Sequence, residues 1–198
     1  MFNARGLSNK EAEIAEFARK RKIDILGITE TWKTGKVATN GFVWKGGNAR
    51  KDGRGSCGFL VANHCAPFFA LNKQRVDDQL WGVFRAAPAK PLALGVAYMP
   101  QESDKKADRE AAYQQLTQEV LLNSTNGDVV LMGDMNCCVG KPSVGEERYI
   151  GKNGEERQRS ANGKLFMSML QECDLVRSTE DEQARWSTLE KITRPDES

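Results

Sequence analysis

The sequence has a single histidine, no paired cysteine motif and no long apolar run. His64 stands alone, and none of the five cysteines forms a C-x-x-C pair, so a zinc site built from Cys and His is not expected. No stretch approaches the ~18 apolar residues of a membrane span, and no basic-then-apolar leader opens the chain. We therefore expect an intracellular protein, nuclear or cytoplasmic, that is not secreted and holds its cysteines reduced.

The composition is otherwise that of an ordinary globular protein. The 198 residues are 39% hydrophobic and 28% charged, which is enough for one domain with a sizeable core. The net charge of +2 permits a nucleic-acid partner without requiring one. We find no internal repeat and no linker, so the sequence predicts a single domain over residues 1–198.

The apolar pattern predicts many short strands with helices between them. Helices are expected over residues 9–21, with Ser8 and Glu11 as a capping box and Phe17 facing inward, over 104–122, and from Asn162 onward. A long loop is expected over 140–160. Consecutive strands favour two sheets with outer helices over a doubly wound parallel sheet. The expected strands cover residues 1–3, 23–29, 42–44, 58–62, 80–85, 92–98, 129–132, 175–176 and 185–187.

One stretch, residues 128–140, joins a strand directly to polar side chains. Val129–Met132 is a short apolar, β-branched run that ends at Gly133. Asp134 and Asn136 follow two residues apart, and in extended chain such residues share a face. A carboxylate and an amide at the end of a buried strand suit a site for a hard metal ion and a phosphate. The alternative is an Asx-rich turn that only ends the strand.

Other polar residues also lie at or just past strand ends. If those ends meet at one edge, they form a pocket suited to metal-assisted phosphodiester cleavage, in which Glu30 holds Mg²⁺ or Mn²⁺. Asp134 would orient or deprotonate the attacking water, and the remaining groups would donate hydrogen bonds to phosphate oxygens. Each residue alone has an ordinary alternative as a solvated strand end, a turn residue or a core aromatic. The set comprises Asn3, Glu30, Tyr98, Asp134 and Asn136.

Several short motifs occur in the order found in one known superfamily. The chain resembles the endonuclease/exonuclease/phosphatase superfamily, and within it the apurinic-endonuclease-like domains of non-LTR (LINE-type) retrotransposons. Singly each motif is weak, but together they extend over essentially the whole chain. The motifs are Phe2–Leu7 (N-x-R-G/S-L), Asp24–Trp32 (D-I-L-x-x-T/S-E-T), Arg54–Gly58 (G-G-x-G), Tyr98–Pro100 (Y-x-P), Leu131–Asn136 (G-D-F-N) and Asn162–Leu165 (N-G-x-L-L).

The resemblance implies a DNase I-like α+β fold, a four-layer αββα sandwich of two sheets flanked by helices, and Mg²⁺-dependent nicking or phosphoester hydrolysis. It implies Glu30 as a metal ligand and Asn3 as a metal or phosphate partner. It also implies Tyr98 and Asn136 as phosphate contacts and Asp134 as the residue that positions water. Further candidates for substrate contact are Gln101, Asn162 and Trp186.

The chain departs from the family pattern at its ends and at Arg5. The family ends with a catalytic strand and an Asp-His pair, whereas this sequence stops at Ser198, and Met1 lies two residues before Asn3. We therefore expect a domain truncated at both ends. Arg5 stands where DNA-repair relatives carry a metal-associated Asp, which favours the retrotransposon branch. That branch implies DNA as partner and fusion to domains such as a reverse transcriptase. The alternatives are a phosphatase or phosphodiesterase on small phosphate esters, and an inactive remnant that at most binds nucleic acid.

Some features are set aside as sites. His64 is far in sequence from every family motif. Gly53–Gly58 spells G-x-G-x-x-G but precedes a strand and opens no helix, so it is no dinucleotide fingerprint. Cys137-Cys138 has no histidine partner nearby in sequence. The basic loop residues serve either solubility or contact with a phosphate backbone; they are Arg50, Lys51, Arg54, Lys152, Arg157, Arg159 and Lys164.

Overall fold

The computed structural model describes residues 1–8, 10–32, 38–46, 56–72, 78–152 and 157–177. The chain divides into two compact units. The first unit comprises Met1–Met99 and Leu122–Asp134, and the second comprises Pro100–Leu121 and Met135–Ser198.

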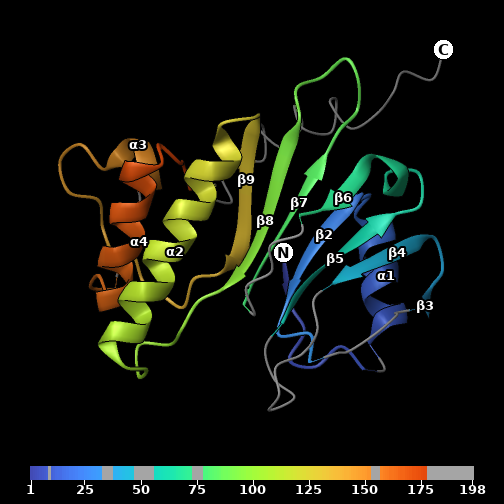
Figure 1. The fold of residues 1–198 in the computed structure, drawn as a ribbon. Coiled ribbons are helices and arrows are strands. Elements are labelled where there is room, and N and C mark those ends of the chain that lie inside the picture. Colours follow the sequence, from blue (N-terminus) through green and yellow to red (C-terminus); the bar gives the residue numbers. More distant parts are fainter. Residues whose placement is uncertain (9, 33–37, 47–55, 73–77, 153–156, 178–198) are drawn as a thin grey trace. The chain divides into compact units, whose positions relative to one another are not determined.

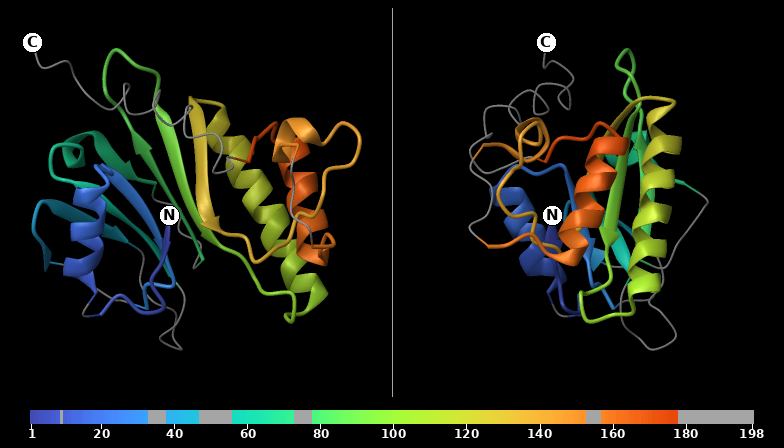
Figure 2. Two further views of the ribbon diagram at one scale, coloured as in Figure 1. Left: turned by 180° about the vertical axis from the view of Figure 1, so that it is seen from behind. Right: turned by 90° about the vertical axis from the view of Figure 1, so that its left-hand side faces the viewer.

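The first unit contains a five-stranded sheet covered on one face by a helix. The strand order is β1-β2-β5-β4-β3, with β1 parallel to β2 and the other pairs antiparallel. Helix α1 (Glu11–Lys20) lies against this sheet (Figures 1 and 2). Its Ile14, Ala15 and Ala18 are buried in one cluster with residues of β2 and β5. The strands are β1 (Phe2–Asn3), β2 (Ile25–Thr29), β3 (Ala38–Thr39), β4 (Phe42–Gly46) and β5 (Cys57–Ala62).

A second, four-stranded sheet in the same unit has the order β6-β7-β8-β9. Strands β8 and β9 run parallel and the other neighbours antiparallel. The predicted hairpin over residues 80–98 is therefore confirmed as β7 and β8. The elements are β6 (Phe69–Leu71), which follows a 3₁₀ turn η1 (Ala66–Phe68), β7 (Gln79–Phe84), β8 (Leu92–Tyr98) and β9 (Asp128–Asp134).

The two sheets share one apolar core. Phe59 and Val61 of β5 are buried in the same cluster as Leu80, Leu94 and Val96 of the second sheet. Alternate residues of each strand point inward because successive side chains of a strand face opposite sides. The two sheets therefore pack face to face, as the predicted two-sheet sandwich requires.

Gly27 shows how closely the sheets approach. A Cβ at Gly27 would lie 2.7 Å from Val96 Cγ2 and 3.3 Å from Met132 Sδ. Glycine alone fits there without a shift of the facing side chains, because β2 crosses directly over β8 and β9. The crossing fixes the ends of these strands relative to one another.

Each sheet contains one parallel strand pair joined by a helix. In the first sheet the pair is β1-α1-β2, and in the second it is β8-α2-β9, where α2 is Lys106–Ser124. Asn3 pairs with Thr29, the residue before Glu30, and Tyr98 pairs with Asp134. The polar residues predicted from the sequence in the first unit thus sit at the carboxyl ends of two parallel pairs, where α/β proteins commonly place their sites.

The second unit contains most of α2, the short helix α3 (Glu147–Ile150) and α4 (Ala161–Glu172). Ser160 caps α4, because its Oγ accepts a hydrogen bond from Gly163 N at 3.1 Å. The Cys173 thiol donates to Thr117 O at 3.8 Å, which ties the end of α4 to α2.

The two-sheet, helix-flanked α+β class is confirmed, and several local predictions are wrong. Helix α1 has Lys10 as its N-cap in place of the predicted Ser8, and the Lys10 side chain makes no capping hydrogen bond. Phe17 is 41% exposed, because Ile14, Ala15 and Ala18 form the buried stripe. Residues 175–176 form no strand, and α3 lies inside the expected loop. The strand expected at 185–187 lies outside the described residues.

Among the residues that the structure describes, no helix combines the length and apolar character needed to cross a bilayer.

We expect Gly27→Ala to lower the free energy of unfolding by about 1–3 kcal/mol, because the added methyl overpacks the contact with Val96. The penalty should shrink in a Val96→Ala background, which removes the facing methyl. Urea denaturation of the four proteins of this cycle measures the coupling.

Gly41→Asn is the matched control. A Cβ there meets no atom within 4 Å, so any cost of this change comes from the φ of +84°, and Asn adopts a positive φ more readily than most residues. An equal penalty for Gly27→Ala in both backgrounds would show that the sheets are not in contact at this point.

Candidate functional site

One amide joins two carboxylates at the strand ends of the first unit. Asn3 Nδ2 donates to Glu30 Oε1 at 3.0 Å and to Asp134 Oδ2 at 3.4 Å. The three residues come from the ends of β1, β2 and β9, and so from both sheets. The structure therefore brings together three of the side chains predicted from the sequence.

Backbone hydrogen bonds hold the Asn3–Glu30 half of this cluster. Arg5 N donates to Asn3 Oδ1 at 3.1 Å, which turns Nδ2 of the amide toward the carboxylates. Gly6 N donates to Glu30 O at 2.9 Å and Leu7 N to Thr31 O at 2.8 Å. The chain after β1 thus stays paired with the chain after β2, beyond the end of the sheet.

Glu30 adopts a left-handed backbone conformation with φ of +51°. For a residue with a side chain this conformation costs on the order of 1–3 kcal/mol and persists only where the surroundings impose it. The bond from Gly6 N to Glu30 O and the buried hydroxyl pair of Thr31 and Ser56 supply that constraint. This backbone conformation turns the Glu30 side chain toward Asn3.

Asp134 and Tyr98 are placed by the β8–β9 pair. They are register partners, and Met99 N donates to Asp134 O at 2.9 Å. A Cβ at Gly133 would lie 2.1 Å from Ala97 O, so glycine alone allows β9 to lie this close to β8 just before Asp134. The half-buried Tyr98 lies beside the cluster at the end of β8.

In the second unit, Asn162 is a fully buried hub with 0% exposure. Its Nδ2 donates to Asn136 O and to Pro100 O, both at 2.9 Å, and its Oδ1 accepts from Arg109 Nη1 at 3.0 Å. These bonds hold the backbone of Asn136, whose φ of +43° is one that asparagine tolerates. Asn162 therefore supports the chain at Asn136.

Neighbouring residues complete this support. Tyr113 of α2 donates its hydroxyl to Met135 O at 2.6 Å. The Glu102 carboxylate accepts from Asn162 N at 3.0 Å, and hydrogen bonds from Ser160 and Asn162 lower the pKa of Glu102. The side chain of Gln101 is exposed, and its backbone N donates to Asp104 Oδ2 at 2.7 Å. Trp186 lies outside the described residues.

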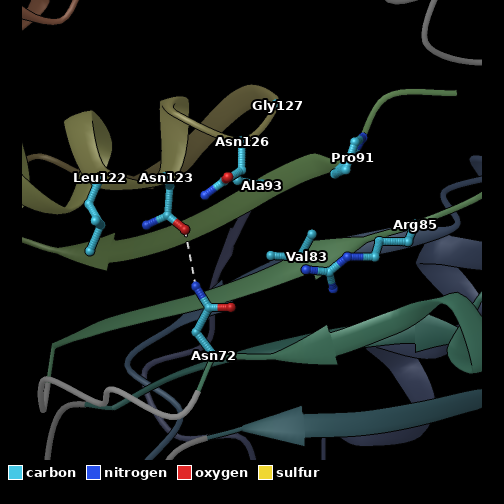
Figure 3. Close-up of a pocket in the computed structure, with 9 residues that line it drawn as sticks. All are labelled: Asn72, Val83, Arg85, Pro91, Ala93, Leu122, Asn123, Asn126 and Gly127. Atoms are coloured by element: carbon cyan, nitrogen blue, oxygen red, sulfur yellow. Dashed lines mark hydrogen bonds between the residues drawn. The ribbon is translucent and has the colours of Figure 1, made fainter.

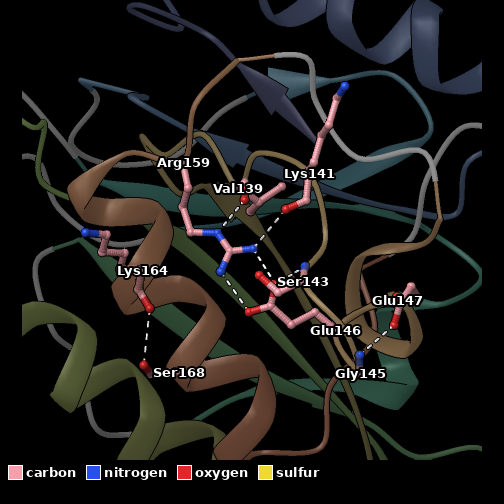
Figure 4. Close-up of polar contacts among 9 residues, drawn as sticks. All are labelled: Val139, Lys141, Ser143, Gly145, Glu146, Glu147, Arg159, Lys164 and Ser168. Carbon is pink, nitrogen blue, oxygen red and sulfur yellow. Dashed lines mark hydrogen bonds and ion pairs between the residues drawn. The ribbon is translucent and has the colours of Figure 1, made fainter.

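An ion pair shapes the loop that follows Asn136, and Figure 4 shows it. Both carboxylate oxygens of Glu146 accept from Arg159, at 2.7 and 2.5 Å, and Arg159 Nε donates to Val139 O at 2.6 Å. The hydrogen bonds that Glu146 accepts from Arg159, and next the one from Ser143 N, lower the pKa of Glu146 to about 2. From the sequence, Arg159 is expected to serve solubility or phosphate contact with the other basic loop residues. In the structure its guanidinium donates hydrogen bonds to Glu146 and to Val139 O. No spacing rule could reveal this, because both residues lie in irregular chain.

The Asn3–Glu30–Asp134 cluster fits a divalent metal ion by its chemistry. Two carboxylates converge on one amide, and such like charges favour a bound cation between them. Carboxylate oxygens are the hard ligands that Mg²⁺ and Mn²⁺ prefer, and here the Asn3 amide orients both carboxylates through its Nδ2 donor. The half-buried positions of all three side chains leave them within reach of solvent.

A pocket of about 430 Å³ in the first unit lies elsewhere (Figure 3). Asn72 and Asn123 join across it by a hydrogen bond of 3.0 Å, and Arg85 lines another side. Gly127, which precedes β9, also lines it, whereas Asp134 ends β9. The pocket contains none of the side chains predicted from the sequence.

Comparisons with known proteins bear on the family and the fold. The model of the Endonuclease/Exonuclease/phosphatase family matches residues 2–186. The endonuclease domain of TRAS1, a telomere-specific non-LTR retrotransposon, superposes with a TM-score of 0.60 at 20% identity, over 86% of this chain and 68% of that one. AP endonuclease LMAP from Leishmania major gives a TM-score of 0.57 at 14% identity, over 87% of this chain but only 65% of its own. At such identities these structures establish the fold alone. A search of curated proteins found no match.

We expect Glu146→Gln to lower the free energy of unfolding at pH 7 by about 1–3 kcal/mol, the range for a hydrogen bond to a charged group. The folded pKa of about 2 lies below the usual value of ~4.3. The ion pair therefore contributes its full stability above about pH 4.3, and the contribution disappears as the pH falls toward 2. Urea denaturation of both proteins from pH 7 downward measures this loss.

Glu147→Gln is the control, since the Glu147 carboxylate accepts from Gly145 N and takes no part in the Glu146–Arg159 ion pair. A difference between wild type and Glu146→Gln that stays constant from pH 7 to pH 3 would contradict the ion-pair account.

Proposed function

The chain belongs to the Endonuclease/Exonuclease/phosphatase family, and we propose that it is a divalent-metal-dependent DNA endonuclease of the non-LTR retrotransposon kind. The observation that carries the proposal is the junction of Asn3 with the carboxylates of Glu30 and Asp134. Phosphodiester hydrolysis needs a group that holds a cation and a second group that handles the proton of water. The junction offers two carboxylates with a shared orienting amide.

We propose Glu30 as the carboxylate that holds Mg²⁺ or Mn²⁺, with Asn3 beside it. The ion, when bound, offsets the negative charge of the phosphate and of the leaving oxygen. The imposed φ of Glu30 keeps its carboxylate at the junction before any ion binds. Such preorganisation avoids a conformational cost during the reaction.

Asp134 is the proposed base. Its carboxylate orients the attacking water and accepts its proton, while Asn3 Nδ2 fixes the direction of that carboxylate. Tyr98, the register partner of Asp134, is proposed to donate its phenol hydrogen to a non-bridging phosphate oxygen. The same role for the amide of Asn136 rests on the Leu131–Asn136 motif.

Asn162 takes a positioning role in this proposal. Its amide is occupied by Asn136, Pro100 and Arg109, so it acts on the backbone of Asn136 in place of the direct substrate contact expected from the sequence. Gln101 and Trp186 stay predictions as substrate contacts. Gln101 is exposed just past Pro100, which leaves its side chain open to a ligand.

We expect the purified chain to convert supercoiled plasmid to open circles in the presence of Mg²⁺. Asp134→Asn should slow this nicking about 10²–10⁴-fold, the usual contribution of a positioned acid or base. Agarose gels of time courses with and without a chelator measure the rates.

Asp128→Asn is the matched control, because Asp128 is the exposed first residue of the same strand. Nicking by Asp134→Asn at the wild-type rate would refute the proposed base. Hydrolysis of a small phosphate ester without plasmid nicking would refute the DNA substrate and favour the phosphatase alternative.

A further inference from the structure

A second group of ligand-type side chains gathers at the opposite end of β2 from Glu30. Asp24 precedes β2, whereas His64 and Cys65 follow β5. One ligand atom from each of these three residues lies within 4.8 Å of the others. His64 Nε2 and Asp24 Oδ1 are 3.1 Å apart. The cluster therefore offers a nitrogen, a sulfur and an oxygen ligand.

The backbone, rather than the side chains, brings these three residues together. Strands β2 and β5 are antiparallel with Ile25 opposite Val61, and Ala62 N donates to Asp24 O at 2.7 Å. Cys65 N then donates to Ala62 O at 2.9 Å, which closes a turn that carries His64 and Cys65. A sheet register and a turn thus preorganise the cluster.

We propose that Asp24, His64 and Cys65 form a zinc site that ties the start of β2 to the turn after β5. Zn²⁺ accepts nitrogen, sulfur and oxygen ligands in a tetrahedron, and three protein ligands leave the fourth position for water. Mg²⁺ prefers oxygen ligands throughout, so this site differs in metal from the Glu30 site. The sequence excludes only a zinc site built from Cys and His ligands. Asp24 supplies a third kind of ligand, which that exclusion does not cover.

The exposure of the three side chains is consistent with a metal site. Cys65 is 2% exposed, whereas the imidazole of His64 is 63% exposed and half-buried Asp24 lies between these extremes. In the proposed site the sulfur is the buried ligand, and the imidazole is the ligand that an ion from solvent meets first. A plain Asp24–His64 ion pair accounts for two of the residues, and Cys65 also packs in the apolar cluster with Phe69 and Leu80. A bound ion would give all three ligand atoms one shared role.

Cys65 is not set up as a nucleophile. Burial, and then the nearby Asp24 carboxylate, raise the pKa of its thiol to about 11. A reactive cysteine needs a lowered pKa and a cationic neighbour. The ligand role of this sulfur rests on its position, because the Cys65, His64 and Asp24 ligand atoms all lie within 4.8 Å of one another.

The zinc site is separate from the proposed catalytic residues. Asp24 and Glu30 flank the five residues of β2, which places their backbones roughly 20 Å apart at ~3.3 Å per residue. We therefore expect zinc to raise the stability of the first unit without supplying the ion for hydrolysis.

Cobalt titration of the reduced, chelator-treated full chain tests the proposal. Wild type should show a thiolate-to-cobalt charge-transfer band in the near ultraviolet and the visible bands of tetrahedral Co²⁺. Added Zn²⁺ should abolish both and raise the melting temperature. His64→Gln should weaken binding by more than the ~10–100-fold typical of outer-shell changes, and Cys65→Ser should lose the charge-transfer band.

Two variants are matched controls. Cys173→Ser removes a different thiol whose pKa is also raised to about 11, and Glu30→Gln removes the proposed catalytic ligand. Both should keep the cobalt spectrum. His64 is exposed, so His64→Gln tests the site even if Cys65→Ser fails to fold.

Three results would overturn the proposal. They are no charge-transfer band in wild type, a band that persists in folded Cys65→Ser, or wild-type cobalt affinity in His64→Gln. Plasmid nicking is read independently, so failure of the zinc site leaves the proposed endonuclease untouched.

Discussion

The site depends on one hydrogen-bonded junction, in which the amide of Asn3 reaches the carboxylates of both Glu30 and Asp134. Two carboxylates repel, so they meet only where the fold compels it. The packing of the two sheets holds the two carboxylates close together, because β2 crosses β8 and β9 at Gly27, where a Cβ would lie 2.7 Å from Val96 Cγ2. A cation at the junction would relieve the repulsion, which links the packing of the core to the chemistry of the site.

Each half of the sandwich supplies its share by the same construction. In each sheet, two parallel strands are joined by a helix, and polar residues lie at or just after their carboxyl ends. In the first sheet these residues are Asn3 and Glu30, and in the second they are Tyr98 and Asp134. Local strain then aims the side chains, at Glu30 through its left-handed backbone. The opposite end of β2 carries the Asp24 cluster, so the same strand serves two different sets of ligands.

The sequence predicted those features that depend on short-range pattern. Short apolar runs ending in Gly or polar residues located β2, β8 and β9, and with them Glu30, Tyr98 and Asp134. That these ends lie close together depends on register and sheet packing, which no local pattern encodes; motif resemblance supplied that expectation. The pairing of Arg159 with Glu146, and of His64 with Asp24, could not be predicted for the same reason. No periodicity in the sequence connects the two segments of either pair.

The central claim is that Glu30 and its neighbours hold the catalytic ion, and the binding of Mn²⁺ tests it most directly. Electron paramagnetic resonance of free Mn²⁺ during titration gives the affinity of wild type, Glu30→Gln and His64→Gln. The account predicts a site in wild type and in His64→Gln whose affinity falls by roughly 10–100-fold or more in Glu30→Gln. Equal Mn²⁺ affinity in wild type and in folded Glu30→Gln would contradict it.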